Sequence, residues 1–518
     1  MHEFPRRDFL LRSGLGLAAS TLTLRAQAGA FDVRTYGAKG DGKTLDAPAV
    51  NRAIDAAAAA GGGVVHFPAG TYACFSIRLK SRVTLDLGPG ATILAADPSA
   101  TAGYDPAEPI ELDKYQDYGH SHFHNSLIWG ESLDNIAITG AGVIHGKGLS
   151  KGTGPGLRAE DPHVGNKAIS LKNCRNVTLR DFSILQGGHF GILATGVDDF
   201  TIDNLKIDTN RDGIDIDCCR NVRVSNTSVN SPWDDAICLK SSFGLGHARA
   251  TEGVTITNCA VSGSYAMGSM LDATFKPLPT GERIPRTGRI KFGTESNGGF
   301  KNITISNCTF DGCQGLALET VDGGLLEDVS ITNITMRDII SAPIFLRLGA
   351  RMRGPAGVPV GVLRRVLISN VVCSSSASYL GSILSGIPGH AIENIKISDV
   401  YVQHQGGGTT ANAALQPAEK EDAYTEPGMF GNMPSHGFYI RHAKDVEISH
   451  VEFELLKPEQ RPVFVMNDVG GVELFRIKST RLAEVPAVVL NNVRDFSISS
   501  SKPLVADTQL DRVDQARI

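Results

Sequence analysis

The sequence predicts an all-β protein, a right-handed parallel β-helix with a short capping helix at its N-terminal end. A polar residue followed by a short apolar strand recurs along the chain, and its clearest copies are 23 and 22 residues apart. Each repeat is too short for a strand and a crossover helix, so helical solenoids and βαβ folds fit poorly. Repeats of this length, β-branched and rich in Asn and Gly, are typical of solenoids. The repeats begin at Asn176, Asp199, Asn221, Gly253, Asn302, Asp328, Arg365, Asn394 and Asp445.

Composition agrees with a long β core and disfavours several classes of partner. The 518 residues include 57 Gly and only 2 Trp, and 42% are hydrophobic. The net charge is -5 and no long run of Lys or Arg occurs, so the charge gives no reason to expect a nucleic-acid partner. The nine cysteines lack metal-type CxxC pairs and fall near apolar runs, which predicts buried thiols, with one or two disulfides left open. The sequence carries no signal for an oligomeric state.

Residues 1–28 are predicted to be a twin-arginine signal peptide. Arg6 and Arg7 precede an apolar stretch from Leu15 to Leu24, and Ala26-Gln27-Ala28 offers a small-residue cleavage site. The apolar stretch is too short and Gly-rich for a membrane span, and no later stretch approaches 18 apolar residues. We therefore expect a periplasmic or secreted protein, exported by the twin-arginine route, with no membrane span in the mature chain.

Residues 29–100 are predicted to form the N-terminal cap and the first coils. Asp46 is placed to cap a helix that runs to Gly61, and a strand follows at Val64 to Phe67. The segment 37–44 fits the Walker A pattern letter for letter. A P-loop needs a helix that opens at its Lys-Thr, whereas this helix opens after Asp46. We interpret the segment as a Gly-rich turn.

Residues 101–518 are predicted to be the β-helical catalytic domain, with an inserted loop near 406–437. Its most informative feature is a pair of acidic motifs, Asn210-Arg211-Asp212 and Trp233-Asp234-Asp235. Asp212 lies 12 residues after Phe200, and the two later aspartates lie 12 and 13 residues after Val222. Since adjacent coils stack about 4.8 Å apart, the three carboxylates are predicted to meet on consecutive coils.

The sequence resembles glycoside hydrolase family 28, the polygalacturonase family, as a divergent bacterial member. The resemblance covers most of the chain from Phe31 onward: it includes 31–42, 63–72 and the stretches around the two acidic motifs, which are its most specific part. It implies a pectin-lyase-like parallel β-helix, no metal or other cofactor, and hydrolysis of pectic poly- or oligosaccharides with inversion at the anomeric carbon. The resemblance therefore implies a glycosidase of carbohydrate metabolism that degrades pectin of the cell wall.

The chemistry of inversion needs one carboxylic acid and one carboxylate. The acid protonates the leaving oxygen, and the carboxylate activates a water on the opposite face of the sugar. Repulsion within a cluster raises at least one pKa and keeps one group protonated. The family pattern assigns Asp234 as the acid and Asp212 with Asp235 as the groups that hold and deprotonate water. Lys240 follows closely enough to contact this cluster, whereas Asp215 and Asp217 are interpreted as turn caps or a solvated ladder.

Two other function classes stay open. A calcium-dependent polysaccharide lyase could use clustered carboxylates, but it also needs a basic residue to abstract a proton, and none stands out. A non-catalytic polysaccharide-binding β-helix would leave the three aspartates without a chemical role. The expected activity is that of an O-glycosyl hydrolase.

The residues around the acids leave the sugar undecided. The family carries a Gly-His-Gly motif after the acid pair, which has no counterpart here, and an Arg-Ile-Lys motif that binds the substrate carboxylate. Arg289-Ile290-Lys291 matches by letters, but the family motif lies one coil later, where this chain has Ala317 and Glu319. An unpaired Glu319 would repel galacturonate and accept a neutral sugar such as rhamnose. Galacturonate stays possible if Arg289 and Lys291 reach the cleft.

Two further residues are predicted to bind substrate. His189 lies 23 residues before Asp212 and so one coil away, and Asn210 belongs to the first acidic motif. Within the inserted loop, residues 424–430 resemble a stretch of bacterial family members. We expect this loop to wall one end of the cleft and to favour exo action on a terminal galacturonosyl or rhamnosyl residue.

Overall fold

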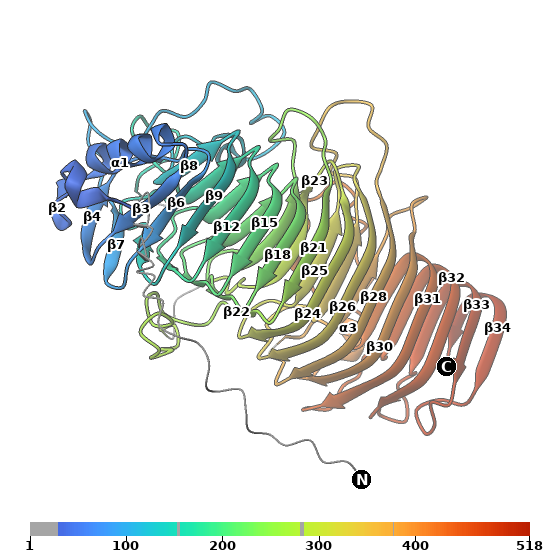
Figure 1. Cartoon of the computed structure of the whole chain (residues 1–518). Helices are drawn as coiled ribbons and strands as arrows, with labels where there is room; N and C mark the ends of the chain where they lie inside the picture. Colours follow the sequence, from blue (N-terminus) through green and yellow to red (C-terminus); the bar gives the residue numbers. More distant parts are fainter. Residues whose placement is uncertain (1–29, 153–155, 280–283, 377) are drawn as a thin grey trace, which may run out of the picture.

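The chain folds as the right-handed parallel β-helix that the sequence predicts (Figure 1). A computed structural model describes residues 30–152, 156–279, 284–376 and 378–518. The predicted signal peptide, 1–28, lies outside the described residues. The coils stack in chain order from the end capped by helix α1 to the last strand (Figure 1). Among the described helices, none is both long and apolar enough to cross a membrane.

Three ladders of parallel strands run along the stack. The ladder that carries the acidic motifs, here called the site ladder, contains β5 (Ile77–Arg78), β8 (Ile128–Glu131), β11 (Lys167–Lys172), β14 (Phe190–Thr195), β17 (Asp212–Asp217), β20 (Ile237–Ser241), β23 (Ile290–Ser296), β25 (Leu316–Thr320), β27 (Ile344–Leu348) and β29 (Ser382–Ser385). The second contains β1 (Ala30–Asp32), β3 (Gly63–Phe67), β6 (Val83–Leu87), β9 (Asp134–Thr139), β12 (Arg175–Arg180), β15 (Asp198–Asp203), β18 (Arg220–Ser225), β21 (Thr251–Thr257), β24 (Phe300–Asp311), β26 (Leu325–Arg337), β28 (Val362–Ser374) and β30 (Ile392–His404). The third contains β2 (Asp41–Leu45), β4 (Gly70–Cys74), β7 (Ala91–Ala95), β10 (Val143–His145), β13 (Ser183–Leu185), β16 (Lys206–Asp208), β19 (Ser228–Asn230) and β22 (Ala260–Ser262).

The second and third ladders merge at β24, a long strand that pairs with both β21 and β22. The site ladder joins them at β31 (Phe438–Leu455), which pairs with both β29 and β30 and is followed by β32 (Phe464–Ser479) and β33 (Val488–Ser499). The last strand, β34 (Thr508–Arg517), pairs antiparallel with β33. It therefore occupies the backbone edge that the parallel stack would otherwise leave open.

The predicted repeat has a backbone cause. Each of the nine polar or glycine residues that begin a repeat has a positive φ, between 52° at Asn176 and 67° at Gly253. Asn, Asp and Gly tolerate this left-handed conformation best, which explains why they recur there. The register follows the predicted spacing, since Val177 pairs with Phe200 and Phe200 with Val222. The coil length read from the sequence is confirmed.

The N-terminal cap is built around α1 (Ala47–Ala59), which buries Val50, Ala53 and Ile54 against the first coils. Asp46 stands at the helix start, but its carboxylate makes no cap hydrogen bond to the helix. It accepts the backbone N–H groups of Lys39 and Gly40 instead, at 2.7 and 2.9 Å. Residues 41–45 form strand β2, so the Walker-like segment does not lead into a helix at its Lys-Thr. The rejection of a P-loop is confirmed, whereas the interpretation as a turn holds for 37–40 only, because 41–44 belong to β2.

The core is a continuous apolar stack of Ile, Val, Leu and Phe that runs the length of the helix. All nine cysteines are buried free thiols, as the prediction of core cysteines requires. The remaining short helices lie in connecting segments: η1 (Val33–Tyr36), α2 (Tyr118–Ser121), α3 (Thr410–Ala413) and η2 (Pro427–Phe430). The last two belong to the inserted loop near 406–437, and α2 belongs to the long connection between β7 and β8.

Candidate active site

The two acidic motifs meet on adjacent coils of the site ladder. Asp212 begins β17, and Asp234 with Asp235 forms the turn before β20. The N–H of Gly213 donates to the Asp235 carbonyl at 3.0 Å, which fixes the two turns against each other. One carboxylate oxygen from each aspartate lies within 4.8 Å of the others. The predicted meeting of the three carboxylates, here called the acid trio, is confirmed.

The carboxylates of the trio differ in burial and in the charges around them. Asp212 is 3% exposed, and burial, followed by the nearby carboxylates of Asp215 and Asp234, raises its pKa well above the usual value. Its Oδ1 atom has no hydrogen-bond partner among the described residues. The Asp234 side chain is 24% exposed and accepts from Arg211 Nε at 3.0 Å. Asp212 is therefore the buried, proton-holding member, and Asp234 is the member that faces solvent.

Arg289 and Lys291 lie directly beside the trio. Arg289 Nε donates to Asp235 Oδ1 at 2.9 Å, and Lys291 Nζ lies 3.6 Å from Asp235 Oδ2. Of the two arrangements left open by the sequence, this one places the basic pair next to the acids. Lys291 also pairs in register with Ala317, so the coil that carries Ala317 lies directly next to the basic pair.

Glu319 lies beneath this pair rather than at an exposed edge. It is 0% exposed, and its carboxylate is 3.7 Å from Lys291 Nζ. Burial raises its pKa to about 8, although Lys291 opposes the rise. At neutral pH the group is mostly protonated. The expectation that Glu319 faces the sugar as a free carboxylate is therefore wrong, because Glu319 is fully buried beside Lys291.

Glu426, from the inserted loop, holds the basic pair from the other side. Its two oxygens accept from Arg289 Nη2 at 2.6 and 2.7 Å, and one accepts from Lys291 Nζ at 2.9 Å. The loop thus reaches the basic pair beside the acid trio, which supports the expectation that it walls the cleft. Sequence reasoning singled out the segment that contains Glu426 but not this residue.

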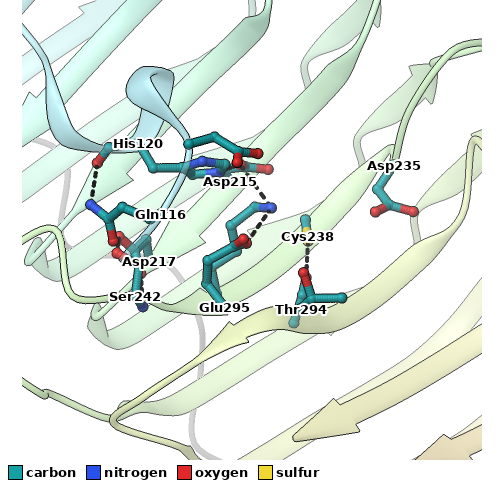
Figure 2. A network of polar contacts seen from close by, with 12 residues as sticks. Gln116, His120, Asp215, Asp217, Asp235, Cys238, Ser242, Thr294 and Glu295 are labelled. Carbon is teal, nitrogen blue, oxygen red and sulfur yellow. Dashed lines mark hydrogen bonds and ion pairs between the residues drawn. The ribbon is translucent and has the colours of Figure 1, made fainter. Parts of the chain in front are cut away.

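A second group of charges gathers around Asp215 and Glu295, apart from Asp235 (Figure 2). Lys240 Nζ is 3.1 Å from Glu295 and 3.7 Å from Asp215, and His120 Nε2 is 3.5 Å from Asp215. Although burial opposes it, Lys240 lowers the pKa of Glu295 well below the usual value. Lys240 therefore pairs with Asp215 and Glu295, and within the described residues no ion pair joins it to the acid trio. Arg353 completes the group by pairing with Glu295.

Asp215 and Asp217 are buried, so their interpretation as a solvated ladder is wrong. Both are 0% exposed because the segments around Gln116 and Ser242 cover this part of the site ladder. Asp217 accepts from Ser242 N and from Thr195, and is structural. Asp215 has no hydrogen-bond partner on either oxygen within the described ranges, and neither has the ring of His120. These unpartnered atoms face each other beside Asp212.

His189 and Asn210 are buried at the margin of the trio. The His189 ring stacks on Phe190, with ring centroids 4.1 Å apart, and Phe190 pairs in register with Asp212. Burial, followed by Arg211, lowers the pKa of His189 well below its usual value, so the ring is neutral. Asn210 is 5% exposed, in the turn that leads into β17. The predicted one-coil offset of His189 is confirmed, while substrate binding by either residue stays a prediction.

The residues that sequence reasoning missed come from distant segments. Arg211 stood inside a recognised motif, and Asp215 alternated with core residues in a way that marks the outer face of a strand. His120 and Glu426 carried no local signal, because connecting segments bring them to the site, whereas Glu295 lies in β23 of the site ladder.

Comparison with known proteins agrees with the fold. Residues 30–266 match the family model described as rhamnogalacturonase A/epimerase, pectate lyase-like. The exo-poly-alpha-D-galacturonosidase of Dickeya chrysanthemi is 36% identical over 135 residues, which is 25% of this chain and 22% of that protein. The polygalacturonase of Medicago sativa is 24% identical over 411 residues, 74% of this chain and 85% of that protein. The solved family 28 exopolygalacturonase of Yersinia enterocolitica superposes with a TM-score of 0.64 at 19% identity, covering 88% of this chain and 79% of that chain.

Proposed function

We propose that the chain is an exo-acting glycoside hydrolase of the polygalacturonase family, glycoside hydrolase family 28, and that it cleaves pectic poly- or oligosaccharides with inversion. The observation that carries this proposal is the acid trio, three carboxylates from two adjacent coils within 4.8 Å of one another. The terminal residue released is galacturonosyl or a neutral, rhamnosyl, residue.

The trio supplies both roles that hydrolysis needs. Three mutually repelling carboxylates retain one proton as a unit. Burial favours its place on Asp212 in the free site, and it must lie on Asp234, with Asp212 ionised, when the leaving oxygen is protonated. Asp234 is the general acid, because it is the most exposed of the three and so can reach the leaving oxygen. Asp212 and Asp235 hold and deprotonate the attacking water. In most inverting glycosidases the two carboxyl groups lie roughly 6.5–9.5 Å apart. The carboxylates of the trio lie closer together, so the anomeric configuration of the product is the sharpest test of inversion.

Two covering segments support exo action. The connection that carries α2 places His120 over the coils before the trio, and the inserted loop places Glu426 over the coils after it. A cleft covered on both sides accepts a chain end more readily than the middle of a chain. Trp233 and Tyr424, 40% and 60% exposed, offer apolar ring faces to a sugar beside the acids.

Product analysis tests the reaction. Pectic and rhamnosyl oligosaccharides should release a single terminal sugar, and proton NMR should show inverted configuration in the first product. Replacement Asp234→Asn should lower kcat by roughly 10²–10⁴-fold, as expected for a lost general acid. Asp199→Asn is the matched control, because Asp199 is exposed and holds a left-handed position that Asn also favours. Retained configuration, or full activity of Asp234→Asn, would contradict the mechanism.

A calcium-dependent lyase is the alternative that the same geometry allows, since the trio could hold a cation. Such an enzyme would lose activity with EDTA and form unsaturated products that absorb ultraviolet light. We expect unchanged activity in EDTA and no such absorbance. A polysaccharide-binding protein without catalysis would release no sugar from any substrate.

Export by the twin-arginine route to the periplasm or the medium, where cell-wall pectin is accessible, is part of the proposal. It rests on Arg6, Arg7 and the apolar stretch that follows. Replacing both arginines by lysine should leave the protein in the cytoplasm. Unchanged export of that variant would contradict this route.

A further inference from the structure

The basic pair beside the acid trio, Arg289 and Lys291, is already occupied by the protein's own carboxylates. Arg289 donates from Nε to Asp235, from Nη1 to Gln314 at 2.7 Å, and from Nη2 to both oxygens of Glu426. Arg289 is 0% exposed and Lys291 is 2% exposed. Since all three guanidinium nitrogens of Arg289 already donate hydrogen bonds, no pair of N–H groups is left to bind a second carboxylate through both of its oxygens.

Glu426 stands where a substrate carboxylate would have to approach. Its side chain is 32% exposed, so it lies on the solvent side of two cations that are themselves enclosed. Against the effect of burial, Arg289 and Lys291 lower the pKa of Glu426 to about 2. The group is therefore a permanent anion at any working pH.

The local charges balance without substrate. Arg289 and Lys291 carry two positive charges, Asp235 and Glu426 supply two negative ones, and Glu319 below them is mostly protonated at neutral pH. The other cations of the site are paired as well: Arg211 with Asp234, Lys240 with Asp215 and Glu295, Arg351 with Asp322, and Arg353 with Glu295. Lys167, further along the ladder, donates to Asn125 and Asn166, and burial lowers its pKa to about 7.

The loop that carries Glu426 is anchored on both sides of it. Arg347 donates to the carbonyls of Glu419 and Lys420, and Arg441 donates to the carbonyls of Pro417 to Glu419. After Glu426, Phe430 packs on the guanidinium groups of Arg347 and Arg441, with the ring centroid 5.4 and 4.9 Å away. Both arginines are buried in the site ladder. These contacts favour a fixed carboxylate over a strap that a substrate displaces.

We propose that Glu426 is a specificity residue that excludes uronates from the subsite beside Asp235, so that the glycosyl residue bound there is neutral. The inference rests on the proposed hydrolase function and names the class of sugar at that site. A hydroxymethyl or methyl group at C5 of the sugar can lie against Glu426 without a charge conflict, whereas a carboxylate would meet a second anion with no cation left to offset it.

Three 4-nitrophenyl glycosides test the proposal. The α-D-galactoside and the α-D-galacturonide differ only at C6, and the α-L-rhamnoside is a second neutral substrate. The wild type should show a higher kcat/KM for the better neutral glycoside than for the uronide, by about tenfold or more, because the uronide meets a like charge. Glu426→Ala opens Arg289 to the substrate, and Glu426→Gln removes the charge at nearly constant volume. Both should lower the neutral-to-uronide ratio by about tenfold.

Glu421→Gln is the matched control, because Glu421 lies in the same loop with an exposed side chain, and its ratio should equal that of the wild type. Calorimetry of galactose and galacturonate on Asp234→Asn, with and without Glu426→Ala, reads binding without catalysis and should show tighter galacturonate binding only with the second change. A wild type that hydrolyses the uronide better than either neutral glycoside would overturn the role of Glu426. Failure to hydrolyse any glycoside or pectic oligosaccharide would instead overturn the proposed function.

Discussion

Two buried carboxyl groups, Asp212 and Glu319, hold protons that an exposed carboxyl group would lose. Asp212 faces Asp215 and Asp234 across the trio, and Glu319 lies below Lys291. The burial of an acid without full hydrogen bonding costs stability and is tolerated where it serves a function. At the residue scale, the buried carboxyl groups of the active site therefore lower the stability of the folded chain.

Glu319 should make stability depend on pH in a defined direction. Its usual pKa is 4.5, and burial raises it to about 8 in the folded chain. Between these values the folded chain keeps a proton that the unfolded chain has released, so stability falls as pH rises, and the loss is complete above pH 8. The variant Glu319→Gln cannot ionise, so its stability relative to the wild type should increase from pH 5 to pH 8.

Urea midpoints at the two pH values measure this difference. Glu111→Gln, at an exposed glutamate, should show the same change with pH as the wild type. An advantage of Glu319→Gln that is equal at pH 5 and pH 8 would show that Glu319 is ionised throughout.

At the same scale, sequence reasoning was correct for side chains whose position depends on the register between adjacent coils. The spacing of Asp212, Asp234 and Asp235 placed the trio because coil length is set locally, by left-handed turns at Asn and Asp. It failed for Glu319, because whether an outward side chain is exposed depends on what covers the ladder. Here the cover comes from Glu426, 137 residues from Arg289 in the chain.

Among the secondary-structure elements, helix α1 shows how one carboxylate can secure a cap. Asp46 binds the turn at Lys39 and Gly40 instead of its own helix, so it ties that turn to the start of the helix and to the first coil. The N-cap position was predictable from the sequence, because Asp precedes Ala-Pro at the helix start. The partner of its side chain was not, because that depends on the path of the preceding turn.

Asp46→Ala should therefore destabilise the cap. Two backbone N–H groups would lose their acceptor, which costs about 1–3 kcal/mol in total. Hydrogen exchange should accelerate at Lys39 and Gly40 and along α1, while exchange in β17 and β20 stays as in the wild type. Asp55→Ala, on the exposed face of the same helix, is the control. Unchanged exchange at Lys39 and Gly40 in Asp46→Ala would contradict this role.

The molecule as a whole is a stack in which each coil contacts mainly its two neighbours. The regular pairing of β12, β15 and β18, coil after coil, shows this arrangement. Local sequence determines such a fold more completely than it determines the segments that cross it, which is why the β-helix could be predicted, whereas the inserted loop could be predicted only as a wall of the cleft and not in its contacts. A stack of this kind depends on what covers its two ends.

Strand β34 covers the last parallel edge, and its removal provides a test at this scale. Without residues 508–518, the backbone of β33 would be open to pairing with another chain. The shortened protein should associate, as seen by light scattering, and should exchange amide hydrogens faster in β32 and β33. Each coil is stabilised mainly by its nearest neighbours, and the acid trio lies several coils away from β34. Activity per folded chain should therefore persist at low temperature. A control that keeps the strand, Arg512→Ala with Asp514→Ala, removes only an exposed charge pair and should stay unassociated. If the shortened chain stays as monodisperse and as thermally stable as the full chain, β34 does not protect the edge, and the stability of the last coils comes from their apolar core alone.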